Sequence, residues 1–496
     1  MLDVGRGQDN QIRLVQSSTN IFEPYIALSY CWGHDGAMIK TEKRNRESFE
    51  SGISILTLPI VFQECISLSR SLGIRYVWID ALCIIQDDRE DWERESSMMS
   101  QTYAQAFLTI AASMSASTSE GFLRSLGGDM KNKEFSKKVH FDGNMSEVKA
   151  RIIPEVGIHS RWTHWYYERH LYPRDPWSQR GWTLQEQLLS PRLLMFTSSE
   201  IQWSCQGGQK CECKSLLNHG RLFGGHSWTD IEENASNAFY FWHKAVEDYS
   251  IRALTHCTDR LPALSGIAQV IQEQTGSTYV AGLWGSNIAE DLLWERTGNL
   301  SLPTDYLAPS FSWASVVGEV DYQCFMNGIH LYQEICQVLS LNVDIQGHNP
   351  LGMVRDGEMT ISGPLTPATL VGDGADGFYY ARIANRSIEF PADTVLATFK
   401  EPSEDGLQEL VACRSRLEMS RPTQVTDDIQ ITTQNIPEVG NSNCDNIHAT
   451  CVADGARCWL LRLGFYLPPH SHPEQVHMFF VLGKHPIKSG KFERYV

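Results

Sequence analysis

The segment Tyr76–Ser96, YVWIDALCIIQDDREDWERES, constrains the fold more than any other part of the chain. Its first half, Tyr76–Ile85, is apolar at both odd and even positions except at Asp80, so both faces of a strand there would be apolar. Acidic residues dominate its second half. A run that is apolar on both parities is typical of a central strand in a parallel sheet, which helices bury on both faces. We therefore predict a strand over Tyr76–Ile85. The acids then lie at its carboxyl end and in the first turn of the next helix, where negative charge suits the helix dipole.

The flanking segments extend this strand into a β-α-β-α-β pattern. Tyr25–Trp32 (YIALSYCW) is expected to be a buried strand, and Phe107–Ala112 (FLTIAA) another. Pro59 marks the first turn of the intervening helix, after Thr57 as a possible cap. The apolar face predicted for this helix has residues at helical spacing, namely Val61, Cys65, Leu68 and Leu72. The pattern predicts an α/β fold with right-handed crossovers.

Asp87 or Asp88 is expected to cap the second helix. One side of that helix carries Trp92, Met99, Tyr103 and Ala106. The acids thus stand at the edge of the sheet where open α/β proteins bind their ligands.

Three regions follow from changes in pattern along the chain. Residues 1–205 are expected to form the α/β domain, with a polar, turn-rich surface excursion at about 125–170. Residues 206–305 show mostly helical periodicity. Residues 306–496 change to short alternating runs punctuated by Gly, Pro and Asp, which predicts a β-rich C-terminal region, α+β in character.

Composition limits the possible partners. A net charge of −17 and a pI of about 5.4 disfavour nucleic-acid binding, because such a surface repels phosphates. Thirteen cysteines without a framework are typical of free thiols in a reducing compartment. No apolar run approaches the roughly 20 residues that a membrane span needs. We expect a soluble, cytoplasmic protein that binds neither nucleic acid nor membrane.

Three sequence blocks point to a family. YIALSYCWG, then LPIVFQECISLSRSLGIRYVWIDALCIIQDDREDWERESSMMSQTYAQAFLTIAAS, then RGWTLQEQLLSPRLLMF resemble, in order and spacing, the blocks of the fungal heterokaryon-incompatibility (HET) domain. The phrases DRLPALSGIA, YVAGLWGSNIAEDLLW and APSFSWASV look like the usual continuation in longer members, so the resemblance covers most of the first 320 residues. It implies a flavodoxin-like core related to TIR domains, and a role in the cell death that follows fusion of unlike fungal cells.

Some TIR relatives cleave NAD at the nicotinamide–ribose bond, and Trp92-Glu93-Arg94-Glu95 resembles their catalytic helix motif. Residues three apart on a helix lie side by side, so the Trp92 ring and the Glu95 carboxylate are expected to point the same way. A carboxylate can stabilise the oxocarbenium-like state of NAD cleavage, and an indole can hold a nicotinamide or adenine ring. The alternative is structural, with Trp92 as a core anchor and Glu95 as a salt-bridge partner.

Further candidates lie at the carboxyl edge of the sheet. Asp80, inside an apolar segment, must be paired or hydrogen-bonded, and either Arg180 or Arg75 is a candidate partner. Asp87 and Asp88 are candidates for binding a ribose or a cation, or form a solvated turn. The remaining edge residues, expected to line a substrate pocket, are Tyr30, Trp32, Gly33, Arg180, Trp182 and Glu186.

Metal binding is not expected, although two groups of residues leave it open. Cys205, Cys211 and Cys213, with His219 nearby, lack the usual C-x-x-C pairs of a zinc site. His470, His472 and His477 resemble the start of a cupin metal motif, but their spacing favours an exposed turn. We expect no cofactor, with NAD as a possible substrate.

Three functions remain open. The first is a HET-type death effector that hydrolyses NAD. The second is a non-catalytic module that self-associates or binds a HET-type protein partner. The third is a HET protein recruited to fungal terpenoid or polyketide secondary metabolism as a cofactor-independent cyclase, for instance of the Diels–Alder type. Such a cyclase needs only a shaped apolar pocket with a few hydrogen-bond donors, which no sequence motif reveals.

Overall fold

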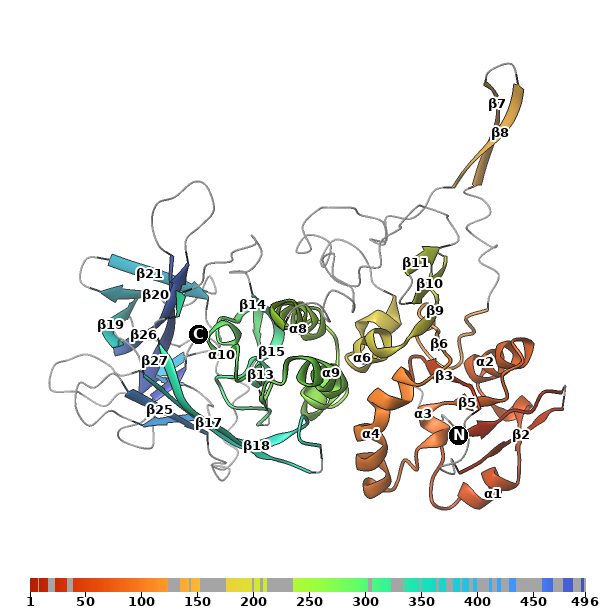
Figure 1. The fold of residues 1–496 in the computed structure, drawn as a ribbon, viewed down its shortest axis with the longest axis horizontal. Coiled ribbons are helices and arrows are strands. Elements are labelled where there is room, and N and C mark those ends of the chain that lie inside the picture. The colour runs from red at the N-terminus through yellow and green to blue at the C-terminus, as the bar shows by residue number, and fades with distance from the viewer. Residues whose placement is uncertain are drawn as a thin grey trace. The chain divides into compact units, whose positions relative to one another are not determined.

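The computed structural model describes residues 1–7, 9–16, 23–33, 39–123, 134–141, 144–151, 175–198, 200–205, 208–211, 235–301, 306–322, 333–334, 336–347, 349–362 and separate strands between 365 and 494. The chain forms two compact units, Met1–Asp230 and Ile231–Val496 (Figure 1). The expected α/β domain, residues 1–205, falls within the first unit, and the β-rich region falls within the second.

A nine-stranded mixed sheet organises the first unit. Four neighbouring strands at its centre are parallel, in the order β9 (Arg192–Phe196), β6 (Leu108–Ala111), β3 (Tyr25–Ser29) and β5 (Tyr76–Trp78). Antiparallel strands extend the sheet beyond both ends of this group, namely β1 (Leu2–Asp3), β2 (Gln11–Leu14), β4 (Ile53–Ser54), β10 (Ile201–Cys205) and β11 (Gly208–Cys211). The predicted α/β class is confirmed, with a sheet that is mixed rather than purely parallel.

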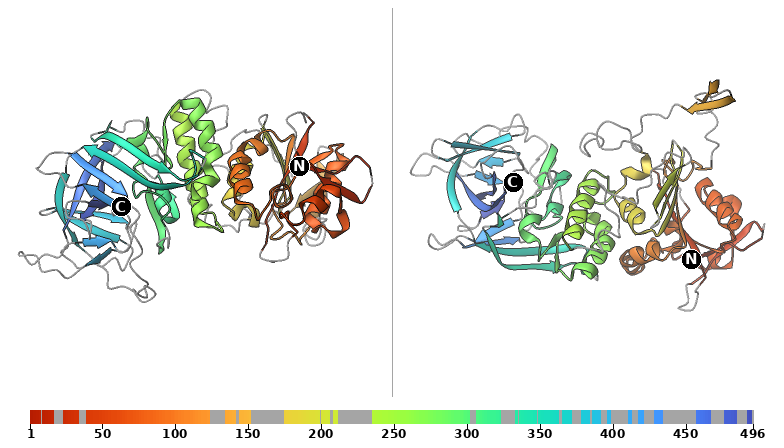
Figure 2. Two further views of the ribbon diagram at one scale, coloured as in Figure 1. Left: turned by 90° about the horizontal axis from the view of Figure 1, so that it is seen from below. Right: turned by 45° about the horizontal axis from the view of Figure 1, so that its top comes forward.

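Helices cover both faces of this sheet (Figures 1 and 2). On one side lie α1 (Arg46–Ser51) and α2 (Ile60–Ser71), and on the other α4 (Arg89–Ala104) and α6 (Trp182–Leu189). Short helical turns connect them, namely η1 (Ile55–Thr57), α3 (Asp80–Cys83) and η3 (Pro176–Gln179). The core between sheet and α2 includes the fully buried side chains of Ile26, Leu28, Val61, Phe62 and Val77.

The structure corrects the predicted central strand. The strand β5 ends at Trp78, and Asp80 begins the helical turn α3 instead of lying inside a ten-residue strand. The Asp80 carboxylate accepts the backbone N–H of Ala81 at 2.7 Å, which favours a helical turn over continued sheet pairing. The turn α3 packs into the core, where Leu82 is fully buried. This burial explains why the residues after Asp80 are apolar although they do not form a strand.

The two crossover helices follow the predicted pattern with shifts at their ends. Asp88 caps α4 by accepting the N–H of Glu90 at 3.2 Å, as predicted for one of the two aspartates. Pro59 precedes α2 instead of forming its first turn. Leu72 follows the last helical residue and is 49% exposed, so its predicted place on the buried face of the helix is wrong.

A hairpin of β7 (Glu134–Phe141) and β8 (Asn144–Arg151) is the described part of the expected surface excursion. All eight residues of each strand pair in antiparallel register. The rest of that excursion lies outside the described residues.

The helical part of the second unit contains the buried side chains of Trp242, Trp284, Trp294 and Trp313. Its helices are α8 (Ala235–Ser250), η4 (Cys257–Arg260), η5 (Pro262–Leu264), α9 (Ser265–Thr275), α10 (Ile288–Asp291) and η6 (Trp313–Ser315). The hairpin of β12 (Tyr279–Val280) and β13 (Leu283–Trp284) turns at Gly282, whose carbonyl accepts the indole N–H groups of Trp242 and Trp313 at 2.9 and 3.0 Å.

Ion pairs are buried on α8 of the same unit. Lys244 Nζ lies 2.8 Å from Glu247 Oε2, and the two side chains are 4% and 0% exposed. The other Glu247 oxygen accepts the backbone N–H of Tyr322 at 3.1 Å. Because both side chains are withdrawn from water, replacing one of them alone is expected to destabilise the fold strongly.

Strands fill the remainder of the second unit. β14 (Glu295–Ser301) pairs with β15 (Val317–Asp321). A four-stranded sheet has the order β17 (Gln337–Ile345), β18 (Val354–Ser362), β25 (Asp428–Thr433) and β24 (Leu417–Ser420). A seven-stranded sheet contains β16 (Gln333–Glu334), β19 (Leu365–Val371), β20 (Phe378–Ile383), β21 (Arg386–Pro391), β26 (Arg457–Tyr466), β27 (Val476–Lys484) and β28 (Phe492–Arg494). β22 (Leu396–Thr398) pairs with β23 (Leu410–Ala412).

Candidate functional site

Asp80 lies at the carboxyl end of β5, beside the residues that follow β3. The hydroxyl of Tyr30 donates to Asp80 Oδ1 at 2.6 Å, and the indole N–H of Trp32 donates to Oδ2 at 2.7 Å. Burial raises the pKa of Asp80, while these two donors act to lower it. Asp80 nevertheless remains partly exposed. The structure thus brings together three residues that the sequence placed at this edge.

The third sequence block joins the same strand end from the other side. The indole of Trp177, in η3, donates to the hydroxyl of Ser29, and that hydroxyl donates to Glu186 Oε2. Arg180 Nη1 donates to the backbone carbonyl of Tyr30. Residues from β3, η3 and α6 therefore interlock at the carboxyl end of β3.

Glu186 is the most deeply buried acid of this network, at 6% exposure. Burial raises its pKa to about 7, against the opposing effects of the Ser29 hydroxyl and the positive charge of Arg180. The negative charge of Asp80 raises it further. The guanidinium of Arg180 also acts to lower the pKa of Asp80, so one cation acts on both carboxyl groups.

The alternative partner proposed for Asp80 is engaged elsewhere. Arg75 forms an ion pair with Asp3 at 2.9 Å, through both Nε and Nη2. Arg180 is therefore the arginine whose charge acts on Asp80.

Gly33 ends the first block and needs to be glycine. Its φ of +83° is a conformation that other residues rarely adopt, and an added Cβ would lie 2.6 Å from the Cβ of Ser117. Gly33 thus allows close approach to the loop after β6. Trp182, the first residue of α6, is partly buried.

Asp87 and Asp88 anchor a neighbouring segment of chain. Asp87 accepts the backbone N–H of Lys43 at 2.8 Å, and the Lys43 ammonium pairs with Asp88 at 3.2 Å. Lys43 is also the main reason that the pKa of Asp88 is lowered. Both carboxylates therefore have structural contacts that account for their position.

Trp92 and Glu95 lie on α4, and both are partly buried. The Glu95 side chain is 26% exposed and lies 3.6 Å from the Arg94 guanidinium. Burial raises the pKa of Glu95, and the negative charge of Asp91 raises it further. Among the contacts of the described residues, none joins Trp92 or Glu95 directly to the Asp80–Glu186 network.

Ser29, Trp177 and Tyr103 are members of the network that sequence reasoning missed. Tyr103, on α4, donates its hydroxyl to the backbone carbonyl of Leu28 at 3.2 Å and acts to lower the pKa of Glu186, although its spacing indicated only a core position. Ser29 lies inside YIALSYCW, and Trp177 precedes the RGW block by a few residues. Their position in or near these blocks is the only feature of the sequence that could have indicated a role in the network.

No group of three or more metal-ligating side chains occurs among the described residues. Cys205 is a free thiol in β10. Cys213, His219, His470 and His472 lie outside the described part of the chain, and Cys211 and His477 lie in strands described by their backbone alone. Within residues described by the structure, no helix is long and apolar enough to cross a bilayer.

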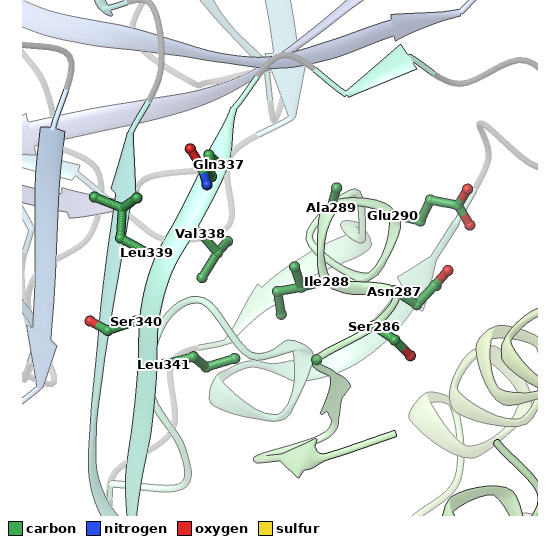
Figure 3. A pocket seen from close by; sticks show the side chains of 11 residues that line it. Ser286, Asn287, Ile288, Ala289, Glu290, Gln337, Val338, Leu339, Ser340 and Leu341 are labelled. Atoms are coloured by element: carbon green, nitrogen blue, oxygen red, sulfur yellow. The ribbon is translucent and has the colours of Figure 1, made fainter. Parts of the chain in front are cut away.

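A separate cavity of about 520 Å³ lies in the second unit, between α10 and β17 (Figure 3). Ile288, Val338 and Leu341 face the open space, and Leu339 points away from it. Sequence reasoning did not find this cavity, because its walls come from distant segments without a motif.

Comparison with known proteins finds one family. Residues 25–186 match the family model described as Heterokaryon incompatibility protein (HET), whereas no curated protein and no solved structure matches the chain. The matched segment begins at β3 and ends at Glu186, so it contains the whole buried network. Residues 25–186 of the chain are therefore identified as a HET domain.

Proposed function

We propose that the HET domain binds a small molecule at the carboxyl edge of its four parallel strands. The observation that carries this proposal is Asp80, a partly exposed residue whose carboxylate is held at that edge by Tyr30 and Trp32. The spatial order β5-β3-β6-β9 is the second, first, third and fourth parallel strand of the chain. This order is the one of flavodoxin-like sheets, which bind ligands outside the carboxyl ends of their strands.

The substrate that best suits this edge is NAD. Asp80 can accept hydrogen bonds from a ribose diol, since carboxylates bind hydroxyl pairs strongly, and Trp32 offers an aromatic face beside it. Glu95 is assigned the role of stabilising the positive charge that develops on the ribose, and Trp92 that of holding the leaving ring. The raised pKa of Glu95 supports this role, because a carboxylate withdrawn from water interacts more strongly with a nearby cation.

The reaction breaks the bond between the nicotinamide nitrogen and the ribose C1′, and the electron pair leaves with nicotinamide. Water then adds its oxygen to C1′ and releases a proton to solvent. The products are nicotinamide and ADP-ribose. In the cytoplasm, consumption of NAD would kill the cell, which is a means of rejecting fusion between unlike cells and suits a heterokaryon incompatibility domain.

Nicotinamide release from NAD by the purified full-length protein tests the proposal. Glu95→Gln and Asp80→Asn are each expected to lower the rate about 100-fold or more, as loss of a charge-stabilising group does in other enzymes. Glu93→Gln is the matched control, because Glu93 lies on the same helix and pairs with Arg89. Absence of nicotinamide with concentrated wild-type protein would reject NAD as the substrate.

The cavity of the second unit favours a second candidate, the cofactor-independent cyclase. Its volume falls in the range of small-molecule pockets, and its mixed lining includes the apolar side chains of Ile288, Val338 and Leu341. A terpenoid or polyketide synthase gene beside this one, together with product loss in Ile288→Trp, would support cyclisation there. Unchanged product in that variant would argue against it.

A non-catalytic interaction module makes the opposite prediction for the first site. In that case Glu95→Gln leaves cell killing intact, and killing depends on self-association or on a protein partner. Cell viability measured with this variant therefore separates the catalytic and non-catalytic proposals.

A further inference from the structure

Among the described residues of the network, two carboxyl groups face one guanidinium. Asp80 and Glu186 lie near one guanidinium, that of Arg180, and each carboxyl group feels the charge of that arginine. The network is continuous through β3, because Ser29 donates to Glu186 while the next residue, Tyr30, donates to Asp80. Arg180 closes the arrangement by donating to the Tyr30 carbonyl.

We propose that Glu186 and Arg180 are positioning residues, which together set the orientation and charge of Asp80 at the ligand-binding edge. The role of Asp80 rests on the proposed function, whereas the coupling between the three side chains does not. Glu186 itself is too deeply buried to touch a ligand, so it acts through Arg180 and the end of β3.

Charge balance gives the mechanism. When both carboxyl groups are ionised, the pair carries one negative charge in excess of Arg180, and like charges at close range disfavour this state. A proton on Glu186 removes the excess and leaves Arg180 to compensate Asp80. When Glu186 ionises, its negative charge attracts the Arg180 guanidinium, and the hydrogen bond of Arg180 to the Tyr30 carbonyl weakens. The two acids therefore titrate as a coupled pair.

The groups around the pair come from every element that packs there. β3 and the residues after it contribute Ser29, Tyr30 and Cys31, α3 contributes Asp80, and α4 contributes Tyr103. Asp175 and Arg180 flank η3, and both act on the Cys31 thiol, whose pKa burial raises to about 11. Tyr30 and Tyr103 have raised pKa values, mainly from burial, so they stay neutral over the range in which Glu186 titrates.

Two tryptophans report on the two acids without any ligand. Trp32 donates directly to Asp80, and Trp177 donates to the Ser29 hydroxyl that donates to Glu186. The experiment follows the indole N–H resonances of the ¹⁵N-tryptophan-labelled full-length protein between about pH 5 and pH 9. Trp32→Phe and Trp177→Phe assign the two signals.

In the wild-type protein both resonances are expected to shift together, with a midpoint near pH 7 set by Glu186. In Glu186→Gln the Trp32 resonance is expected to lose this transition, although residue 186 does not touch Trp32. An unchanged Trp32 transition in this variant would overturn the proposal, as would a Trp32 signal that does not move with pH in the wild type.

Variants of Arg180 test whether this residue couples Glu186 to Asp80. Arg180→Lys retains a cation and is expected to keep the coupled transition with a shifted midpoint, whereas Arg180→Met is expected to uncouple the two resonances. If Arg180→Met does not fold, the comparison of Glu186→Gln with the wild type still decides the outcome.

The kinetic consequence is measured separately with NAD. In the wild type, KM is expected to rise by roughly tenfold from pH 6 to pH 8 as Glu186 ionises and competes with Asp80 for Arg180, while kcat changes less. In Glu186→Gln, KM is expected to stay nearly constant over that range. If no variant cleaves NAD, the proposed function fails, but the tryptophan resonances still test the coupling.

Discussion

Replacing Glu186 by glutamine should change how the stability of the first unit depends on pH. The pKa of this carboxyl moves from 4.5 to about 7 on folding, chiefly because it is buried. Between those values the folded state holds a proton that the unfolded chain has released. The free energy of unfolding therefore falls as pH rises from about 4.5 to 7. The total loss from this one group is about 3 kcal/mol.

The amide introduced by Glu186→Gln would mimic the protonated acid at every pH. Its carbonyl can still accept the Ser29 hydroxyl, and it carries no charge to desolvate. At pH 5 the variant should match the wild type, and at pH 8 it should exceed it by about 3 kcal/mol. For a unit of this size, that difference corresponds to a rise in Tm of about 6–12 °C.

Urea unfolding of the full-length protein, followed by tryptophan fluorescence at several pH values, measures this difference. Trp177 is 2% exposed and hydrogen-bonded within the network, so its emission reports on this unit. The control is Glu93→Gln, whose stability should remain parallel to that of the wild type at all pH values. A Glu186→Gln variant that is less stable than the wild type at pH 8 would refute the assignment of Glu186 as an unfavourably buried acid.

Three further substitutions test the packing. Gly33→Ala should destabilise the first unit by about 1–3 kcal/mol in urea unfolding, since the new methyl group meets Ser117 and φ is positive; an unchanged midpoint would contradict the close approach. Gly282→Ala should cost the second unit a similar amount, because its Cβ would lie 2.6 Å from Trp313 Nε1, and retention of the wild-type Tm would argue against that turn. Glu247→Ala should cost about 3–5 kcal/mol, because it removes a buried ion pair with Lys244 and the acceptor of the Tyr322 N–H, and circular dichroism melting below and above neutral pH measures the loss.

The fold of the first unit was largely accessible from the sequence because its parallel strands are short, apolar and separated by amphipathic helices. The segments Tyr25–Trp32 and Phe107–Ala112 contain β3 and β6 as predicted. The segment Tyr76–Ile85 was misread because a buried helical turn and a buried strand both give a continuous apolar run, and periodicity does not separate them over so few residues. The antiparallel extensions also carry no distinctive pattern, since each spans only a few residues.

Several residues of the site could be predicted from the sequence, but the hydrogen bonds that join them could not. Tyr30, Trp32 and Asp80 follow parallel strands, so their meeting at one edge follows from topology. The direct hydrogen bond between Ser29 and Glu186 depends on the side-chain packing of segments far apart in sequence, which no local pattern encodes. Whether Glu95 takes part remains a prediction for the nicotinamide assay.

The hydrogen bond between Ser29 and Glu186 joins residues 157 positions apart. A ribosome adding about 5–20 residues per second takes on the order of 10 s to synthesise that length. During this interval the nascent chain holds the first three parallel strands without the segment that completes their polar edge. Any shortened translation product ending before Trp177 would lack the completed edge permanently, so the polar edge of the domain forms only after nearly all of the domain has been synthesised.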